Sequence, residues 1–282
     1  MNNKIMLIDE LIELAIREDV GDGDHTSLAC IPTYTKGKAK LLVKENGIIA
    51  GIELAEQIFK KIDSSIIFNP KLKDGDAIKI GDVAFYVEGS SQSILKAERL
   101  VLNFMQRMSG IATKTNYYTT LLEGLPTKIL DTRKTTPGNR LIEKWAVQLG
   151  GGVNHRIGLY DMVMIKDNHI DYAGGIENAI NKVVEYLKTN NKLLKIEIEA
   201  RDLKELDEIL KVGKVHRIML DNFSFEDLRT AVKLIDGKYE TEASGGINEK
   251  TIRAYAECGV DFISVGALTH QINSLDLSLK AL

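Results

Sequence analysis

Six short apolar runs, spaced regularly beyond residue 127, constrain the fold more than any other feature of this sequence. They cover residues 129–130, 162–165, 194–198, 218–220, 239–243 and 262–265. Between them lie stretches in which apolar residues recur at helical spacing, over 141–149, 176–187, 203–210, 225–235 and 248–258. Because strand and helix alternate in this way, we expect parallel strands joined by crossover helices.

Each of these six runs is followed by polar residues or by a glycine. The residues at these ends are 131–134, Lys166, Glu199, Asp221, Ser244 and Gly266. In a βα barrel all the strand ends face one mouth, where chemistry takes place, whereas an open sheet gathers its functional residues at a single crevice. We therefore predict an α/β fold with a TIM-like βα barrel, which is incomplete because six strands are fewer than eight.

The first part of the chain has a different pattern. Apolar residues recur at helical spacing over 7–18, and the Asp- and Gly-rich loop 19–27 ends that helix. Runs of β-branched and aromatic residues between turn signals predict strands at 39–43, 66–68, 77–80 and 84–87. The pattern over 93–122 is helical again, with an interruption near Gly110. These features are typical of a small α+β module followed by a connecting helix.

We divide the chain into three parts on this basis. Residues 1–112 form an N-terminal α+β sandwich domain with the connecting helix, and residues 113–268 form the βα barrel, which is the catalytic domain. Residues 269–282 form a C-terminal tail that returns to the N-terminal domain.

The composition excludes several classes of protein. The 282 residues are 44% hydrophobic, which is enough to fill a sizeable core, and the formal net charge of -3 provides no basic surface for nucleic acid or membrane. Cys30 and Cys258 are far apart and lack metal-ligand spacing, so we expect a reducing compartment, the cytoplasm, and no zinc site. The first apolar run is too short for a signal peptide or a membrane span.

Positive charge is concentrated over residues 128–169, where seven Lys and Arg residues face four acids. Arg140 and Lys144 fall inside a helical pattern, so we expect both to be solvated helix residues. Arg133 and Lys134 instead follow a strand directly. They precede Thr135 and a further hydroxyl near a helix N-terminus, an arrangement that suits an anion.

Two further groups of cations follow. His155 and Arg156 come after three glycines, and a guanidinium beside a second donor can hold a planar carboxylate in a fixed orientation. Lys166 closes the apolar run 162–165, where its charge would be desolvated without an anion. Lys166 is therefore a candidate for ligand binding or for Schiff-base chemistry.

Two carboxylates end the next two strands. Alternation puts Glu197 and Glu199 on one face, with Glu199 nearer the mouth, and Asp221 ends the following strand. Glu199 and Asp221 could act as general acid and base, hold Mg²⁺, or support a sugar that becomes positive during reaction. They could also form structural ion pairs with the cations opposite.

Glycine-containing loops follow the last two strands. One contains Ser244, Gly245 and Gly246, and the other contains Gly266. Paired loops of this kind hold a phosphate with backbone N–H groups in many βα barrels. The ligand therefore carries carboxylate groups, phosphate groups, or both.

Several of these segments, taken in order, resemble quinolinate phosphoribosyltransferase, also called nicotinate-nucleotide diphosphorylase (carboxylating). The segments that carry the resemblance are DTRKTTPG at 131–138, NHR at 154–156, DM at 161–162, KDNH at 166–169, EIE at 197–199, LDNF at 220–223 and EASGGI at 242–247. EDVGDGD at 18–24, AER at 97–99 and SGIAT at 109–113 also match. The similarity is colinear from about residue 10 to residue 280.

This resemblance implies an enzyme of NAD synthesis. It would join quinolinate to 5-phosphoribosyl 1-diphosphate and release diphosphate and CO₂, giving nicotinate mononucleotide. Quinolinate is a dianion and the donor carries still more negative charge, so the local excess of cations agrees with this reaction.

The resemblance also implies a division of roles among the site residues. The quinolinate carboxylates would be received by Arg133, His155, Arg156 and Lys166, with Arg99 donated across a dimer interface by a neighbouring subunit. The donor would be bound by Lys134 and Thr135 near its diphosphate, by Glu199 and Asp221 near its ribose and Mg²⁺, and by Ser244, Gly245, Gly246 and Gly266 at its 5-phosphate. The catalytic residues among these would be Lys134, Lys166, Glu199 and Asp221. Mg²⁺ would arrive with the donor, with no dedicated metal site in the chain.

Other interpretations remain open at this point. One is the molybdenum-transport-associated relative of the same family, although the intact set of Arg133, His155, Arg156 and Lys166 favours the quinolinate enzyme. Another is a Schiff-base barrel aldolase that uses Lys166 as its nucleophile. A binding module without catalysis would make poor use of the carboxylates. The sequence is also compatible with either a homodimer or a homohexamer.

Overall fold

The computed structural model describes residues 2–282 and the side chains from residue 6 onward, so Met1 of the N-terminal domain lies outside the described residues. The chain forms two compact units. Unit 1 contains the N-terminal residues to Asn116 together with Thr135–Gly151 and Leu268–Leu282, and unit 2 contains Tyr117–Lys134 and Gly152–Ala267. Each unit has its own sheet.

Unit 1 is built on a four-stranded antiparallel sheet in the order β12-β1-β5-β3. Its strands are β1 (Lys36–Val43), β3 (Ile67–Pro70), β5 (Val83–Ser90) and β12 (Leu277–Ala281). A separate pair consists of β2 (Gly47–Ile48) and β4 (Ala77–Ile78). Leu41 in β1 lies opposite Phe85 on one side and Leu279 on the other, so β12 completes the edge of this sheet.

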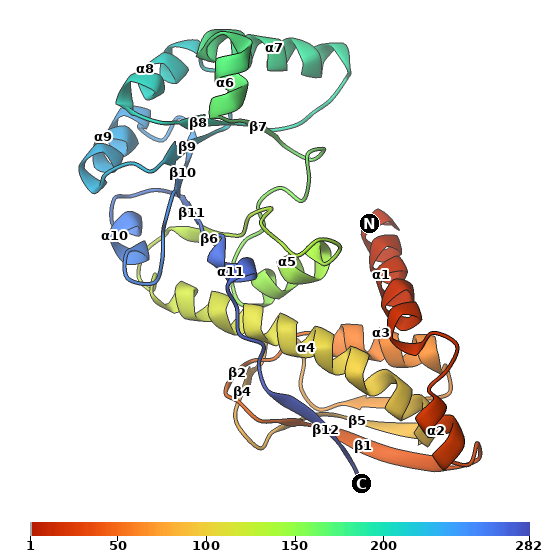
Figure 1. The fold of residues 1–282 in the computed structure, drawn as a ribbon. Coiled ribbons are helices and arrows are strands. Elements are labelled where there is room, and N and C mark those ends of the chain that lie inside the picture. The colour runs from red at the N-terminus through yellow and green to blue at the C-terminus, as the bar shows by residue number, and fades with distance from the viewer. Residues whose placement is uncertain (1) are drawn as a thin grey trace. The chain divides into compact units, whose positions relative to one another are not determined.

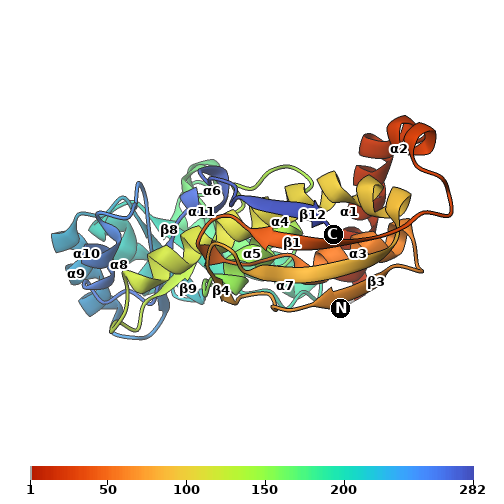
Figure 2. The ribbon, with the colours of Figure 1, turned by 90° about the horizontal axis from the view of Figure 1, so that it is seen from below.

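Helices cover one face of this sheet. The helices of unit 1 are α1 (Asn2–Val20), α2 (His25–Cys30), α3 (Ile52–Ile62), most of α4 (Ser91–Thr120), α5 (Arg140–Leu149) and most of α11 (Ala267–His270). α3 and α4 lie on the same face of the sheet (Figures 1 and 2). Phe59 of α3 meets Phe85 of β5 edge to face at 6.1 Å between ring centroids, and both side chains are fully buried. The alternation of buried residues in β1 and β5 thus builds the core of unit 1.

Two expectations for unit 1 are wrong. The loop expected over 19–27 gives way to α2 at His25, where the Asp24 carboxylate caps the helix by accepting the Ser27 N–H at 3.1 Å. The interruption expected at Gly110 is absent, because α4 is continuous over Ser91–Thr120. A Cβ at position 110 would overlap the carbonyl oxygen of Asn273, so this glycine permits close packing and does not end the helix.

Unit 2 contains a six-stranded sheet in the order β6-β11-β10-β9-β8-β7. The strands are β6 (Lys128–Leu130), β7 (Val163–Ile165), β8 (Ile196–Ala200), β9 (Arg217–Asp221), β10 (Glu240–Ser244) and β11 (Phe262–Ser264). All neighbouring pairs are parallel. Within residues 2–282, β6 and β7 form no ladder with each other, so the barrel is open at this position. The predicted incomplete βα barrel is confirmed.

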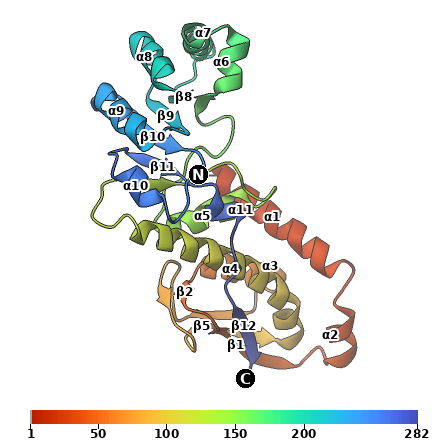
Figure 3. The ribbon, with the colours of Figure 1, turned by 60° about the vertical axis from the view of Figure 1, so that its left-hand side comes forward.

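Five helices of unit 2 lie on the outer side of these strands (Figure 3). They are α6 (Asp167–Ala173), α7 (Ile176–Thr189), α8 (Leu203–Val212), α9 (Phe225–Ile235) and α10 (Ile252–Ala256). All except α6 were expected from the apolar spacing. None of the helices over residues 2–282 is long and apolar enough to span a membrane.

Candidate active site

The carboxyl ends of the parallel strands in unit 2 carry most of the predicted site residues. The ends contain Arg133 and Lys134 after β6, Lys166 after β7, Glu199 in β8, Asp221 at the end of β9, Ser244 at the end of β10, and Gly266 after β11. Because the strands are parallel, these ends share one edge of the sheet, as expected for a barrel mouth.

Two predicted site residues belong to unit 1. Thr135 is half-buried, and its hydroxyl accepts a hydrogen bond from Nε of Arg140 at 3.0 Å. Arg99 lies on α4 with its side chain exposed. Its guanidinium makes no hydrogen bond or ion pair with any residue that the structure describes, so it is available to an anion.

Lys166 and Glu199 form an ion pair across β7 and β8, with 3.4 Å between Nζ and Oε2. The Lys166 side chain is 47% exposed and that of Glu199 is 9% exposed. Burial raises the pKa of Glu199, the positive charge of Lys166 lowers it, and the negative charge of Asp221 raises it again. Glu199 therefore lies between one cation and a second carboxylate.

Two arginines meet at the same edge. Burial lowers the pKa of Arg156, and the positive charge of Arg133 lowers it further. Two positive charges that act on each other in this way would both attract a bound anion with two acceptor groups.

Neighbouring carboxylates hold the segment that carries Arg156. Asp161 accepts the backbone N–H groups of Ile157 at 2.7 Å and Gly158 at 2.9 Å, which closes a tight loop. Buried Asp131 accepts the backbone N–H of His155 at 2.8 Å. Arg156 itself donates to the carbonyl of Met162 at 3.3 Å. The backbone on both sides of Arg156 is thus fixed, which orients its guanidinium.

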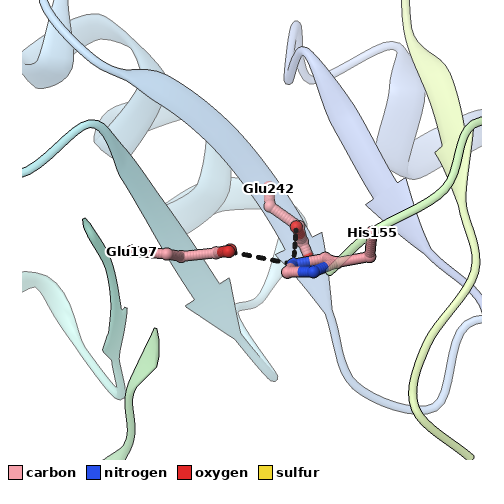
Figure 4. Close-up of side chains that lie close together, drawn as sticks. All are labelled: His155, Glu197 and Glu242. Atoms are coloured by element: carbon pink, nitrogen blue, oxygen red, sulfur yellow. Dashed lines mark ion pairs between the residues drawn. The ribbon is translucent and has the colours of Figure 1, made fainter. Parts of the chain in front are cut away.

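His155 is buried against two carboxylates inside the barrel, as Figure 4 shows. Its Nε2 lies 2.9 Å from Oε2 of Glu197 and 3.3 Å from Oε2 of Glu242, and both glutamates are 0% exposed. Arg217 approaches the same carboxylate of Glu242 at 3.3 Å. The sequence indicated that Glu197 shares the face of Glu199, but the roles of Glu242 and Arg217 were missed. The signal that could have identified them was the alternation of charged and apolar residues along β9 and β10.

This cluster changes the proton affinity of its members. Burial by itself lowers the pKa of His155, but the hydrogen bonds and charges of Glu197 and Glu242 outweigh it and raise the pKa to about 9. Burial and the negative charge of Glu242 raise the pKa of Glu197. For Glu242 burial acts in the same direction, but His155 reverses the result and lowers the pKa.

These three residues also have the donor set of a metal site, since one ligand atom from each lies within 4.8 Å of the others. The other ring nitrogen of His155 is already used, because Nδ1 accepts the backbone N–H of Arg156 at 2.6 Å. Arg217 lies 3.3 Å from Glu242 and 3.0 Å from Glu240, so one fixed positive charge already stands beside these carboxylates.

A second group of residues holds the segment after Lys134. Arg107 on α4 forms an ion pair with the fully buried Glu143 at 2.6 Å and donates to the Thr136 hydroxyl at 2.8 Å. The carboxylate of Glu143 also accepts the backbone N–H of Thr136 at 3.2 Å. Lys144, expected in solvent, is 1% exposed. That expectation is wrong because Ile142, Glu143 and Lys144 of α5 are all buried within unit 1, where α5 contacts α1 and Glu143 pairs with Arg107.

Comparison with known proteins points in one direction. A sequence profile described as "Quinolinate phosphoribosyl transferase, C-terminal domain" matches residues 111–280, and one described as the N-terminal domain matches residues 24–109. Quinolinate phosphoribosyltransferase (decarboxylating) 1b of Nicotiana tabacum is 47% identical over 285 residues, which cover 96% of this chain and 81% of the tobacco protein. A chloroplastic nicotinate-nucleotide pyrophosphorylase (carboxylating) of Arabidopsis thaliana is 48% identical over the same shares.

Solved structures agree. NadC from Streptococcus pyogenes is 39% identical and superposes with a TM-score of 0.92 over 98% of this chain and 97% of its own. The nicotinate-nucleotide pyrophosphorylase from Francisella tularensis is 40% identical, with a TM-score of 0.91 over 98% and 96%. Both units are therefore included in the similarity.

Proposed function

This chain belongs to the quinolinate phosphoribosyltransferase family, and from that premise we propose how its residues divide the work between two substrates. The enzyme joins quinolinate to 5-phosphoribosyl 1-diphosphate and releases diphosphate and CO₂. The product is nicotinate mononucleotide, a precursor in NAD synthesis.

The acceptor side consists of Arg133, His155, Arg156 and Lys166. The observation that carries this assignment is that Arg133, Arg156 and Lys166 follow β6 or precede and follow β7, where the charge of Arg133 acts on Arg156, an arrangement that suits a dicarboxylate. His155 directly precedes Arg156, and its Nε2 lies against its two glutamates. Lys166 keeps half of its side chain exposed and can exchange its ion pair with Glu199 for a substrate carboxylate.

The donor side consists of the remaining strand ends. Lys134 and Thr135 face the diphosphate, Glu199 and Asp221 face the ribose, and the 5-phosphate is held by Ser244, Gly245, Gly246 and Gly266. As diphosphate leaves, positive charge develops on the ribose ring, and the two carboxylates stabilise it. Once the ring nitrogen of quinolinate is ribosylated, its positive charge accepts the electrons left by departing CO₂. Decarboxylation therefore needs no separate cofactor.

Mg²⁺ is the metal that this chemistry requires, and the donor side suits it. Glu199 and Asp221 are close enough that one raises the pKa of the other, and Mg²⁺ prefers carboxylate and phosphate oxygens. Mg²⁺ bound to the donor would neutralise the diphosphate as it leaves. Lys134 adds a fixed positive charge near the same group.

We further propose a homo-oligomer, a dimer or a hexamer, in which Arg99 completes the acceptor site of a neighbouring subunit. The exposed position of Arg99 on α4 and its lack of a partner within residues 2–282 support this role. We place the protein in the cytoplasm, because Cys30 and Cys258 are both free thiols.

An acceptor assay tests the reaction. Purified protein is supplied with 5-phosphoribosyl 1-diphosphate, Mg²⁺ and either quinolinate, nicotinate or nicotinamide, and nucleotide formation is followed. Losing one carboxylate leaves a cation that the bound ring has desolvated without its partner, so nicotinate should show a kcat/KM lower by about 30-fold or more. Comparable turnover of nicotinate and quinolinate would overturn the assignment. Reductive trapping of Lys166 with a carbonyl substrate would favour the aldolase instead.

A further inference from the structure

The backbone of Asn222 adopts a conformation that few residues other than glycine accept. Its φ is 56°, in the left-handed region, directly after the last residue of β9. Its N–H donates to the carbonyl of Ser244 at 2.9 Å, which continues the pairing of Asp221 with Ser244 by one more hydrogen bond. Asparagine tolerates this conformation better than most residues, but the conformation still has a cost that its surroundings must offset.

The side chain of Asn222 contacts both neighbouring parts of the donor side. Its Nδ2 donates to Oδ2 of Asp221 at 2.6 Å. On the other side, a Cβ at Gly245 would overlap Oδ1 of Asn222 and would lie 2.6 Å from its Cγ and 2.9 Å from its backbone nitrogen. Gly245 therefore sits directly against this amide, and the two positions constrain each other.

We propose that Asn222 is a positioning residue for the sugar-phosphate donor, which couples the carboxylate of Asp221 to the loop of Gly245. The proposal rests on the donor side described under the proposed function. By donating to one oxygen of Asp221, Asn222 leaves the other oxygen oriented toward the sugar. By filling the space beside Gly245, it fixes the backbone of the loop that receives the phosphate.

The same geometry predicts that a substitution at Asn222 changes the binding of the donor alone. The cations assigned to the acceptor follow β6 and β7 or lie in the loop between them, and neither strand pairs with β9. A change at Asn222 should therefore alter donor affinity and leave acceptor affinity as it was. If Asn222 only terminated β9, its substitution would instead weaken the binding of both substrates and lower the stability of the protein.

Two substitutions separate the amide from the backbone. Asn222→Gly keeps the left-handed conformation and removes the amide, and Asn222→Asp keeps a similar shape but places a second carboxylate against Asp221. Asn191→Gly is the matched control, because Asn191 is another left-handed asparagine of unit 2, with a φ of 50°, in the connection between α7 and β8.

Affinity for 5-phosphoribosyl 1-diphosphate with Mg²⁺ is measured by calorimetry, together with the KM for each substrate and the Tm. We expect Asn222→Gly to weaken donor binding about tenfold, which is typical for a lost hydrogen bond to a charged group, and Asn222→Asp to weaken it further. The KM for quinolinate should stay within about twofold in both variants, and Asn191→Gly should match the unmodified protein.

Donor affinity unchanged in Asn222→Gly would overturn the proposal, and so would an equal loss for both substrates with a lowered Tm. Failure of the proposed function is a different result. In that case the unmodified protein would not convert quinolinate, whereas donor binding and its response to Asn222 could still be measured by calorimetry.

Discussion

Nε2 of His155 lies 2.9 Å from Oε2 of Glu197, and neither side chain has meaningful contact with solvent. This pair, completed by Glu242, makes the stability of the barrel depend on pH. The folded-state pKa of His155 is raised to about 9, above its ordinary value of 6.5. The stabilisation is therefore fully present below pH 6.5 and is lost as pH rises through about 9.

The expected loss in the free energy of unfolding is about 3 kcal/mol between these pH values. The raised pKa of Glu197 also makes stability fall as pH rises, but between its ordinary 4.5 and about 7, which is mostly below this window, and the lowered pKa of Glu242 acts only at acid pH. Urea unfolding at several pH values measures the slope. Glu242→Gln should flatten it. Glu240→Gln, on the same strand as Glu242, removes an ion pair to Arg217 of β9 and should not flatten it. Equal slopes in the two variants would contradict this account.

Gly110 provides a test of packing in unit 1. Gly110→Ala would place a methyl group against the carbonyl of Asn273 and 3.3 Å from Cα of Ser274. We expect the free energy of unfolding to fall by about 1–3 kcal/mol, as for other overpacked sites. Asn103→Ala, on an exposed position of the same helix, should change it by less than about 0.5 kcal/mol. Thermal unfolding that shows no difference between the two variants would show that this contact can relax.

Chelation tests the metal. Activity should vanish when divalent ions are removed and return with Mg²⁺ or Mn²⁺, because the departing diphosphate needs its charge neutralised. Calorimetry without the donor should show only weak Mg²⁺ binding to the protein, since the ion is expected to arrive with the donor's phosphates. Full activity after exhaustive chelation would rule out this role.

Arg99 tests whether sites are shared between subunits. Arg99→Ala and Lys166→Ala proteins should each be inactive, but mixing them with subunit exchange should restore activity. In a two-fold dimer each site takes Arg99 from one chain and Lys166 from the other, so a mixed dimer keeps one intact site. Half of the dimers are mixed after random exchange, and about a quarter of the unmodified activity should return. Verified exchange without recovery would exclude a shared site.

The regular part of the fold could be predicted because its signal is periodic. Each of the six strands of the barrel was expected from an apolar run that ends on a polar residue or a glycine. The short helices α2 and α6 were missed, because six or seven residues contain too few turns to show a period. At Gly110 a local rule indicated a break, and a tertiary contact with Asn273 explains the glycine instead.

The residues of the site likewise fall into those that the sequence predicted and those that it did not. Residues at strand ends, such as Lys166 and Glu199, were identified because the barrel fixes where they lie. Glu242 and Arg217 were missed, because they lie inside the barrel, where the sequence shows only an alternation of charged and apolar residues. Their pairing with His155 depends on which strands are neighbours, and that information is absent from any single segment.

The pairing of β12 with β1 has a consequence for how the chain folds during synthesis. The strands β1, β3 and β5 leave the ribosome early, but the edge of their sheet is completed only when residue 281 has been made. Every strand of the barrel is available before that moment. Closure of the N-terminal sheet is therefore a late step, and the unpaired edge of β1 must be protected from other chains while the barrel is being translated.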